Sequence, residues 1–310
     1  MLRALCVAGV VWLLTACGGG GGGSSQLSEE LSALRSDPRI VRLGQVNNRS
    51  DTLRMSDLRI DYSVRAQGET LSEAVTLNTS CQGDRCSAGG ETVSLADLLD
   101  PANDIELTNW ELGSQGEFDT IRASGSGSID SPTVEGVTAN VSAHATAYGL
   151  WGKYGYASVE TGRADVSGRT QGIRFTGDMR YAVGYAYGDA TGLNPVGTSR
   201  ATWHGIARGI SKHTYATEDG TVTLTLEDLS RPFMDVDIEG ITSEGTYTWE
   251  NVPLSKGHFS GRRGSVRRPG FFSNVGTYEI DGGLYGPNHE EAYGVFHAGD
   301  YVGSFGASRQ

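Results

Sequence analysis

The feature that most constrains the fold is a series of eight short strand-like segments in the last third of the chain. They cover residues 201–210, 221–227, 234–241, 245–251, 257–262, 276–285, 292–298 and 301–307. In the clearest of them, Val222, Leu224 and Leu226 alternate with threonines, as in a strand with one buried face. Eight regularly spaced short strands favour an antiparallel up-and-down β-barrel, because a closed sheet has no exposed edge.

The preceding part of the chain is also expected to be mainly β. Residues 58–65 alternate apolar and polar side chains, a second strand is expected near 74–79, and residues 105–195 are rich in glycine and aromatic residues. Leucines at helical spacing predict one short helix over residues 26–36, and Ser94 is expected to cap a helical turn. We therefore expect an all-β protein, with one β domain over residues 26–195 and the barrel over 196–310.

One strand of the first domain has two unlike faces. Tyr181, Val183 and Tyr185 alternate with Ala182, Gly184 and Ala186. Small side chains allow something to pack closely against that face. A covering sheet or helix is the favoured interpretation, and a ligand groove is the alternative.

Composition limits the classes of function. The chain has 45 glycines among 310 residues, about twice the ordinary share, which suits a protein made of short strands and turns. Hydrophobic residues make up 37% and charged residues 20%, so a core can form. The net charge of -12 argues against nucleic acid as a partner, because such binding needs clustered lysine and arginine.

The N-terminus has the pattern of a signal peptide. Arg3 precedes an apolar run over residues 4–14, which is too short to span a bilayer, and Leu14, Thr15, Ala16 and Cys17 follow. This tetrapeptide resembles the bacterial lipobox, which implies cleavage after residue 16 and lipid on the sulfur of Cys17. A lipoprotein anchored in the membrane is thus expected, with a flexible Gly/Ser tether up to residue 25. Gly18, rather than aspartate, follows Cys17, and by resemblance to bacterial sorting rules this favours the outer membrane. An ordinary secretory leader is the alternative.

Cysteine usage fits an oxidising compartment. Cys6 lies in the expected leader and Cys17 takes the lipid, which leaves Cys81 and Cys86. Gly83 lies between these two cysteines, as in the tip of a hairpin closed by a disulfide. A zinc site is less favoured, because one pair of cysteines without a second pair cannot supply four ligands.

One segment is basic in this acidic chain. Its charged and aromatic residues are Arg262, Arg263, Arg267, Arg268, Phe271 and Phe272. Arginine and aromatic residues are enriched where protein interfaces bind most strongly, so these six residues are candidates for contact with a partner. The alternative is a solvated loop near lipopolysaccharide phosphates or near acidic side chains of the chain itself.

No motif indicates catalysis or a resident metal. Asp235, Asp237 and Glu239 begin like a calcium loop, but Thr246 occupies the position of the required final glutamate. His289 begins a zinc-protease pattern whose last position is Tyr293. We expect a protein that is not an enzyme and has no cofactor, although a haem or iron site built from distant side chains stays open.

Three ordered motifs carry a resemblance to a known family. They cover residues 197–205, 282–291 and 301–309 and resemble the barrel domain of transferrin-binding protein B and its relatives, a structural group that includes factor H-binding protein. The resemblance implies a handle-like β domain, then an eight-stranded barrel, on a lipoprotein at the surface of a Gram-negative bacterium.

The motif residues also have structural interpretations of their own. Gly282, Gly283 and Gly286 are expected to bend the chain, and Trp203, Tyr285, Phe296 and Phe305 to fill the barrel interior or its mouth. Glu290 and Glu291 are expected in a solvated turn. The two-lobe members of the family are longer than this chain, which has room for one lobe, so no particular ligand is implied.

The function expected from these features is capture. An outer-membrane lipoprotein would bind a protein or solute of unknown identity without turnover. The resemblance implies iron or haem acquisition, through an iron carrier or haem, as the commonest role in the family. A lipocalin-like carrier with a small ligand inside the barrel, and a structural or adhesion protein, are the alternatives.

Overall fold

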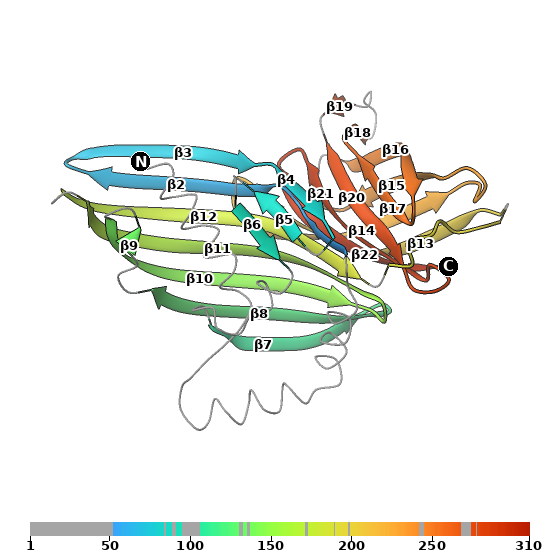
Figure 1. Ribbon diagram of the computed structural model, residues 1–310, viewed down its shortest axis with the longest axis horizontal. Helices are drawn as coiled ribbons and strands as arrows, with labels where there is room; N and C mark the ends of the chain where they lie inside the picture. The colour runs from blue at the N-terminus through green and yellow to red at the C-terminus, as the bar shows by residue number, and fades with distance from the viewer. Residues whose placement is uncertain are drawn as a thin grey trace, which may run out of the picture.

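The computed structural model describes residues 52–83, 85–88, 91–94, 106–129, 133–134, 137–170, 173–188, 190–197, 199–241, 245–267, 274–276 and 278–310. The fold is all-β: a broad curved sheet, the handle, lies beside a barrel (Figure 1). No helix long and apolar enough to cross a membrane occurs among these residues. The helix expected over 26–36, the lipid site expected at Cys17 and the turn expected after Ser94 lie outside them, and Ser94 itself ends a strand.

The handle is a single antiparallel sheet with the strand order β3-β2-β12-β11-β10-β8-β7, in which β1 also pairs with β12 and β9 with β10. Its strands are β1 (Thr52–Met55), β2 (Leu58–Ala66), β3 (Glu69–Leu77), β7 (Glu106–Gln115), β8 (Phe118–Ile129), β9 (Thr133–Val134), β10 (Val137–Trp151), β11 (Gly155–Thr170) and β12 (Ile173–Gly188). The alternation in the sequence from residue 58 predicted β2 correctly, since its apolar residues are buried.

Strands β1 and β2 follow each other along the same long partner, β12. Between them Ser56 is held against Gly184 by two hydrogen bonds, from Ser56 N to Gly184 O (2.9 Å) and from Gly184 N to Ser56 Oγ (2.8 Å). The break in the strand at Ser56 and Asp57 lies where the handle meets the barrel. The nearly buried side chain of Asp57 can therefore reach the barrel from this position.

A small three-stranded sheet accompanies the handle. It consists of β4 (Thr79–Gln82), β5 (Arg85–Ala88) and β6 (Glu91–Ser94). The disulfide between Cys81 and Cys86 joins β4 to β5, where the two residues are direct partners. Cys86 is buried in the apolar core of the handle, so the disulfide closes a hairpin that is fastened to the main sheet.

The barrel has eight antiparallel strands in a closed ring, as the sequence pattern predicted. The ring consists of β13 (Ala201–Ser211), β14 (Thr217–Leu226), β15 (Phe233–Glu239), β16 (Thr246–Ser255), β17 (His258–Gly261), β20 (Glu279–Tyr285), β21 (Glu291–Ala298) and β22 (Tyr301–Arg309). Pairing of β13 with β22 and of β15 with β16 closes it. Val236 and Ile238 of β15 are fully buried, so the acids between them belong to a strand, as expected.

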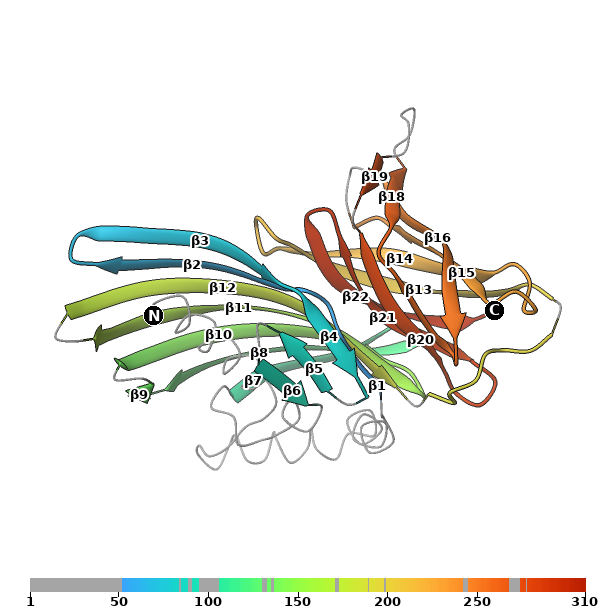
Figure 2. The ribbon, with the colours of Figure 1, turned by 45° about the horizontal axis from the view of Figure 1, so that its top comes forward.

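A short hairpin lies outside this ring. Strands β18 (Gly264–Arg267) and β19 (Asn274–Gly276) are inserted between β17 and β20, which pair directly with each other. Strand β18 also pairs with one end of β16. The hairpin projects from the body of the barrel (Figure 2). We call residues 262–278 the basic excursion.

Glycines of the barrel wall lie opposite aromatic residues. The cross-strand pairs are Phe259 with Gly282, Phe296 with Gly303, Phe305 with Gly294 and Tyr293 with Gly306. A Cβ on any of these glycines would come within 2.8 Å of the partner's ring. The rings therefore lie across these four glycines, where a larger residue would not fit.

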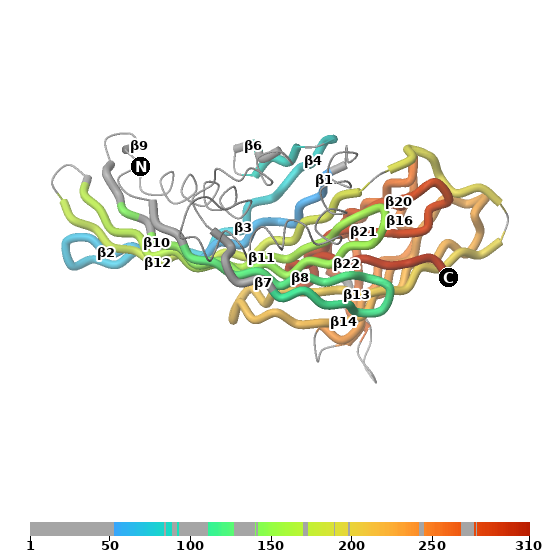
Figure 3. The backbone as a smooth tube through the Cα atoms, turned by 90° about the horizontal axis from the view of Figure 1, so that it is seen from below, coloured from blue at the N-terminus to red at the C-terminus, as the bar shows by residue number. Residues whose placement is uncertain are grey.

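The small-residue face of β12 packs on the barrel. Ala182 shares an apolar cluster with Ile210 and Val302, and Ala186 shares another with Ile206 and Tyr285. Seen from below, β11 and β12 run alongside β21 and β22 (Figure 3). The covering sheet expected from the sequence is thus the barrel wall, and the alternative of a ligand groove on this face is wrong.

Candidate functional site

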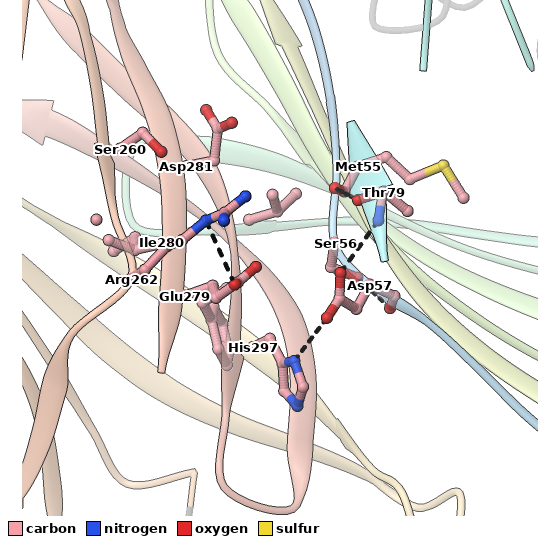
Figure 4. A pocket seen from close by; sticks show the side chains of 13 residues that line it. Met55, Ser56, Asp57, Thr79, Ser260, Arg262, Glu279, Ile280, Asp281 and His297 are labelled. Atoms are coloured by element: carbon pink, nitrogen blue, oxygen red, sulfur yellow. Dashed lines mark hydrogen bonds and ion pairs between the residues drawn. The ribbon is translucent and has the colours of Figure 1, made fainter. Parts of the chain in front are cut away.

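A narrow groove lies at the boundary between handle and barrel. Met55, Ser56, Asp57 and Thr79 line it from the handle side, and residues of β17, β20 and β21 line it from the barrel side (Figure 4). Its volume is about 70 Å³. Arg262, Glu279 and Asp281 lie at its barrel side, so the groove brings one of the predicted contact residues next to the handle.

A chain of three polar side chains crosses this boundary. The Oδ2 atom of Asp57 lies 2.9 Å from Nδ1 of His297, and Nε2 of His297 lies 2.9 Å from Nζ of Lys212. With Nδ1–H donating to the carboxylate, Nε2 accepts from the ammonium group. Burial lowers the pKa of Lys212. Asp57 also accepts the backbone N–H of Thr79 at 3.2 Å, so the chain fastens the handle and its small sheet to the barrel.

A second contact across the boundary involves Glu291. Its two carboxylate oxygens accept the backbone N–H groups of Lys153 and Tyr154, each at 2.8 Å, and Oε2 also accepts the hydroxyl of Tyr293 at 3.0 Å. Glu291 is only 8% exposed. The expectation that Glu291 lies in a solvated turn is wrong, because the turn between β10 and β11 covers it and supplies the donors.

The surroundings of Glu291 affect its neighbours. Burial, with the carboxylate of Glu291 nearby, raises the pKa of Tyr293 well above its ordinary value. Tyr285 packs against Tyr293 in the cluster between handle and barrel, with the ring centroids 5.7 Å apart. Tyr285 therefore lies on the outside of the barrel, whereas Trp203, Phe296 and Phe305 fill its core as expected.

All six predicted contact residues belong to the basic excursion, and three of them are among the described residues. The guanidinium of Arg262 is 3.6 Å from Glu279, and that of Arg267 is 3.8 Å from Glu250. The Arg262 side chain is 82% exposed and the Arg267 side chain 63%. Ion pairs that are this long and this exposed contribute little to the free energy of folding. Arg263 is exposed and has no ion pair within the part of the chain that the structure describes.

The other three predicted residues, Arg268, Phe271 and Phe272, lie outside the described residues. The strand that leads to them is firmly held. Val266 is buried in the barrel core, and the indole N–H of Trp249 donates to the carbonyl of Tyr278 at the far end of the excursion. Contacts with the barrel therefore hold both ends of the basic excursion in place.

Comparison with known proteins gives structural matches only. No family model matches the sequence, and no curated protein sequence matches it either. Solved structures that match include intact Ap-TbpB with its N and C lobes (12% identity, TM-score 0.32), isotype 1 transferrin-binding protein B from serogroup B Neisseria meningitidis (15%, 0.35) and a mutant transferrin-binding protein B from Haemophilus parasuis (12%, 0.36).

These matched structures are transferrin-binding protein B structures, the family that the sequence motifs resemble. Each match covers 81% of this chain but only 44–46% of the other chain, so this chain spans about half the length of those proteins.

The residues that join the two domains were missed by the sequence analysis. Asp57, Lys212 and His297 each belong to a different segment, and none is part of a motif. Strand β21 is buried along nearly its whole length and has no polar–apolar alternation, so its sequence gave no signal for His297. Among the described residues, no group of three or more histidine, cysteine or acidic side chains could hold a metal ion.

Proposed function

We propose that this protein is an outer-membrane lipoprotein that captures a protein or solute at the cell surface and does not catalyse a reaction. The observation that carries the proposal is the basic excursion, a hairpin that is not needed to close the barrel and that presents exposed arginines. Because β17 and β20 pair directly with each other, the barrel closes without this hairpin. Contact with another molecule is therefore the best reason for its presence.

Electrostatics favours an acidic contact surface on the partner. The chain has a net charge of -12, yet three described arginines of the excursion have either weak ion pairs or none. Arginine binds carboxylates through two parallel hydrogen bonds, and it is often part of interface hot spots. Arg268, Phe271 and Phe272 would extend the same contact surface.

Anchoring would follow from the N-terminal sequence. Lipid on Cys17 and the glycine-rich tether up to residue 25 would keep the handle and barrel near the membrane while leaving them free to turn. The contacts of Asp57 and Glu291 across the boundary favour a single orientation of handle and barrel. A preorganised surface loses less conformational entropy when it binds.

We propose an iron carrier or haem as the ligand, because the sequence motifs resemble those of transferrin-binding protein B. A small ligand enclosed in the barrel fits less well, because Trp203, Trp249, Phe259, Phe296 and Phe305 fill the core of the barrel. The enclosed-ligand alternative would need these side chains to move apart.

The proposal is tested by binding to the immobilised protein. Iron-loaded transferrin, haemoglobin and free haem are the probes, and the variant changes Arg262, Arg263, Arg267 and Arg268 to alanine. The matched control changes four arginines of the handle, Arg65, Arg163, Arg169 and Arg174, which alters the net charge equally. We expect one probe to bind wild type and control alike and the excursion variant at least tenfold more weakly. Equal weakening in both variants would contradict a role for the excursion, and binding of no probe would contradict iron capture.

A further inference from the structure

A second cavity lies beside the groove and carries positive charge. It has a volume of about 200 Å³, far more than the roughly 10–15 Å³ that a single water needs. The handle contributes Arg54 to its lining, and the chain between the domains contributes residues 190–192. The barrel contributes Lys256, Gly257, His258, Gly283 and the aromatic ring of Tyr285. The cavity is thus built from both domains.

Arg54 is the central group of this cavity. It is only 8% exposed, and its Nε atom lies 2.8 Å from Oδ1 of Asp281, across the domain boundary. Nη1 donates to the carbonyl of Leu53 at 3.0 Å. Among the described residues, Nη2 makes no hydrogen bond, and Nε, despite its short distance to Asp281, has no hydrogen-bond partner either. A nearly buried guanidinium therefore keeps unused donors.

The charges around Arg54 do not balance. Asp281 is shared, because its Oδ1 atom also lies 2.7 Å from Nε2 of His258. Lys256, in the exposed turn between β16 and β17, adds a cation with no ion pair in the described structure. None of the described lining residues is acidic, whereas Asp57, Glu279 and Asp281 all line the neighbouring groove. The cavity has an excess of positive charge on an acidic protein.

The backbone shapes the cavity around these cations. Lys256 (φ 55°) and Gly257 (φ 76°) form a tight turn in the left-handed region, which aims the turn at the interdomain chain. A Cβ on Gly257 would come 2.9 Å from the carbonyl of Leu193, and Asn194 Oδ1 accepts the N–H of Gly257 at 2.8 Å. This contact holds the turn with Lys256 against residues 190–194, so the wall of the cavity is fixed.

We propose that this cavity binds a small oxyanion, a phosphate or carboxylate group, between the handle and the barrel. The free Nη2 donors of Arg54 bind its oxygens, Lys256 supplies a second positive charge, and His258 lies at the barrel side. Because Arg54 belongs to β1 and Lys256 to the barrel, the bound anion joins the two domains. Binding then stabilises the folded protein by an amount that grows with the logarithm of the anion concentration once this exceeds the Kd.

The test is titration calorimetry of the full chain with sodium phosphate and with sodium citrate, at ionic strength held constant with sodium chloride. The variant Lys256→Gln removes one cation from an exposed turn that the core does not depend on. Its matched control is Lys153→Gln, another exposed lysine, on the turn between β10 and β11. We expect phosphate, citrate or both to bind, about tenfold more weakly to Lys256→Gln and unchanged to Lys153→Gln.

A second variant tests the buried group. Arg54→Gln removes the guanidinium, and its thermal unfolding with and without the anion is compared with that of wild type. We expect the anion to raise the unfolding temperature of wild type but not that of Arg54→Gln. Preference for phosphate would identify a tetrahedral ligand, and preference for citrate a carboxylate. No binding of either probe by wild type, or equal weakening by Lys256→Gln and Lys153→Gln, would overturn the proposal.

Discussion

Gly184 of the handle lies directly against Gly303 of the barrel: a Cβ on Gly184 would stand 2.4 Å from the carbonyl oxygen of Gly303. Backbone thus meets backbone where β12 crosses β22. Because neither glycine has a side chain to withdraw, the two strands can approach this closely only with glycine at position 184. The orientation of handle and barrel depends on this contact as well as on Asp57 and Glu291.

Replacing Gly184 by alanine is expected to push the two domains apart. The new methyl group meets a carbonyl oxygen that cannot move without moving β22, so we expect a loss of about 1–3 kcal/mol in the free energy of unfolding, measured with urea. Ser167→Ala, at an exposed position of β11 in the same sheet, is the control and should change little. An unchanged free energy in Gly184→Ala would contradict the close contact.

The carboxylate of Glu291 is expected to stabilise the same contact between handle and barrel. Glutamine has one acceptor oxygen, and its amide group would face a backbone N–H of Lys153 or Tyr154. Leaving a buried donor without an acceptor costs about 1–3 kcal/mol, so Glu291→Gln should lower the free energy of unfolding by that amount. The exposed Glu218→Gln serves as the control. Equal stability of the two variants would show that Glu291 is not buried against the turn.

Alkaline pH is expected to weaken the fold through Tyr156. Burial raises the pKa of its phenol to about 12, from an ordinary value of 10.0. Between these two values the unfolded chain releases the proton and the folded chain keeps it, so stability falls as pH rises, by about 1.4 kcal/mol per pH unit for this group. Below pH 10 the contribution is fully present. Unfolding in urea from pH 9 to 12 should show a shallower decline for Tyr156→Phe than for wild type. Identical slopes would contradict burial of the phenol.

Reduction of the disulfide is expected to loosen the hairpin of β4 and β5. Closing so short a loop contributes about 2 kcal/mol by restricting the unfolded chain. The Cys81→Ser, Cys86→Ser double variant should therefore unfold at a lower temperature than wild type and should not respond to dithiothreitol. A reductant effect of equal size on the double variant would mean that another group is responsible.

Strand patterns in the sequence predicted the fold well, for a physical reason. Alternation such as that of Val222, Leu224 and Leu226 reflects a local geometry, in which every second side chain faces the same side. The hairpin of β18 and β19 was not predicted, because its strands have only four and three residues and are placed by pairing with β16 and with each other. The segment was instead interpreted from its charge.

The contacts between the domains could not be predicted for a different reason. Glu291 is polar and follows a turn, which usually means exposure, and its partners lie 137 and 138 residues earlier in the chain. Asp57 and His297 are separated by 240 residues. Burial of such groups depends on which donors the tertiary structure brings to them, and a single sequence does not encode that locally. The small face of β12 was predictable, because the absence of side-chain bulk is itself a local signal.

The most direct test of capture by the basic excursion is photo-crosslinking on intact Gram-negative cells that express the full chain. A benzoylphenylalanine replaces Arg263 in one strain and Arg163, exposed on the handle strand β11, in the other. Cells are illuminated in the presence of iron-loaded transferrin or haemoglobin. We expect a crosslinked product of one of these proteins from position 263 and none from position 163. No product from position 263, or equal products from both positions, would contradict capture at the excursion.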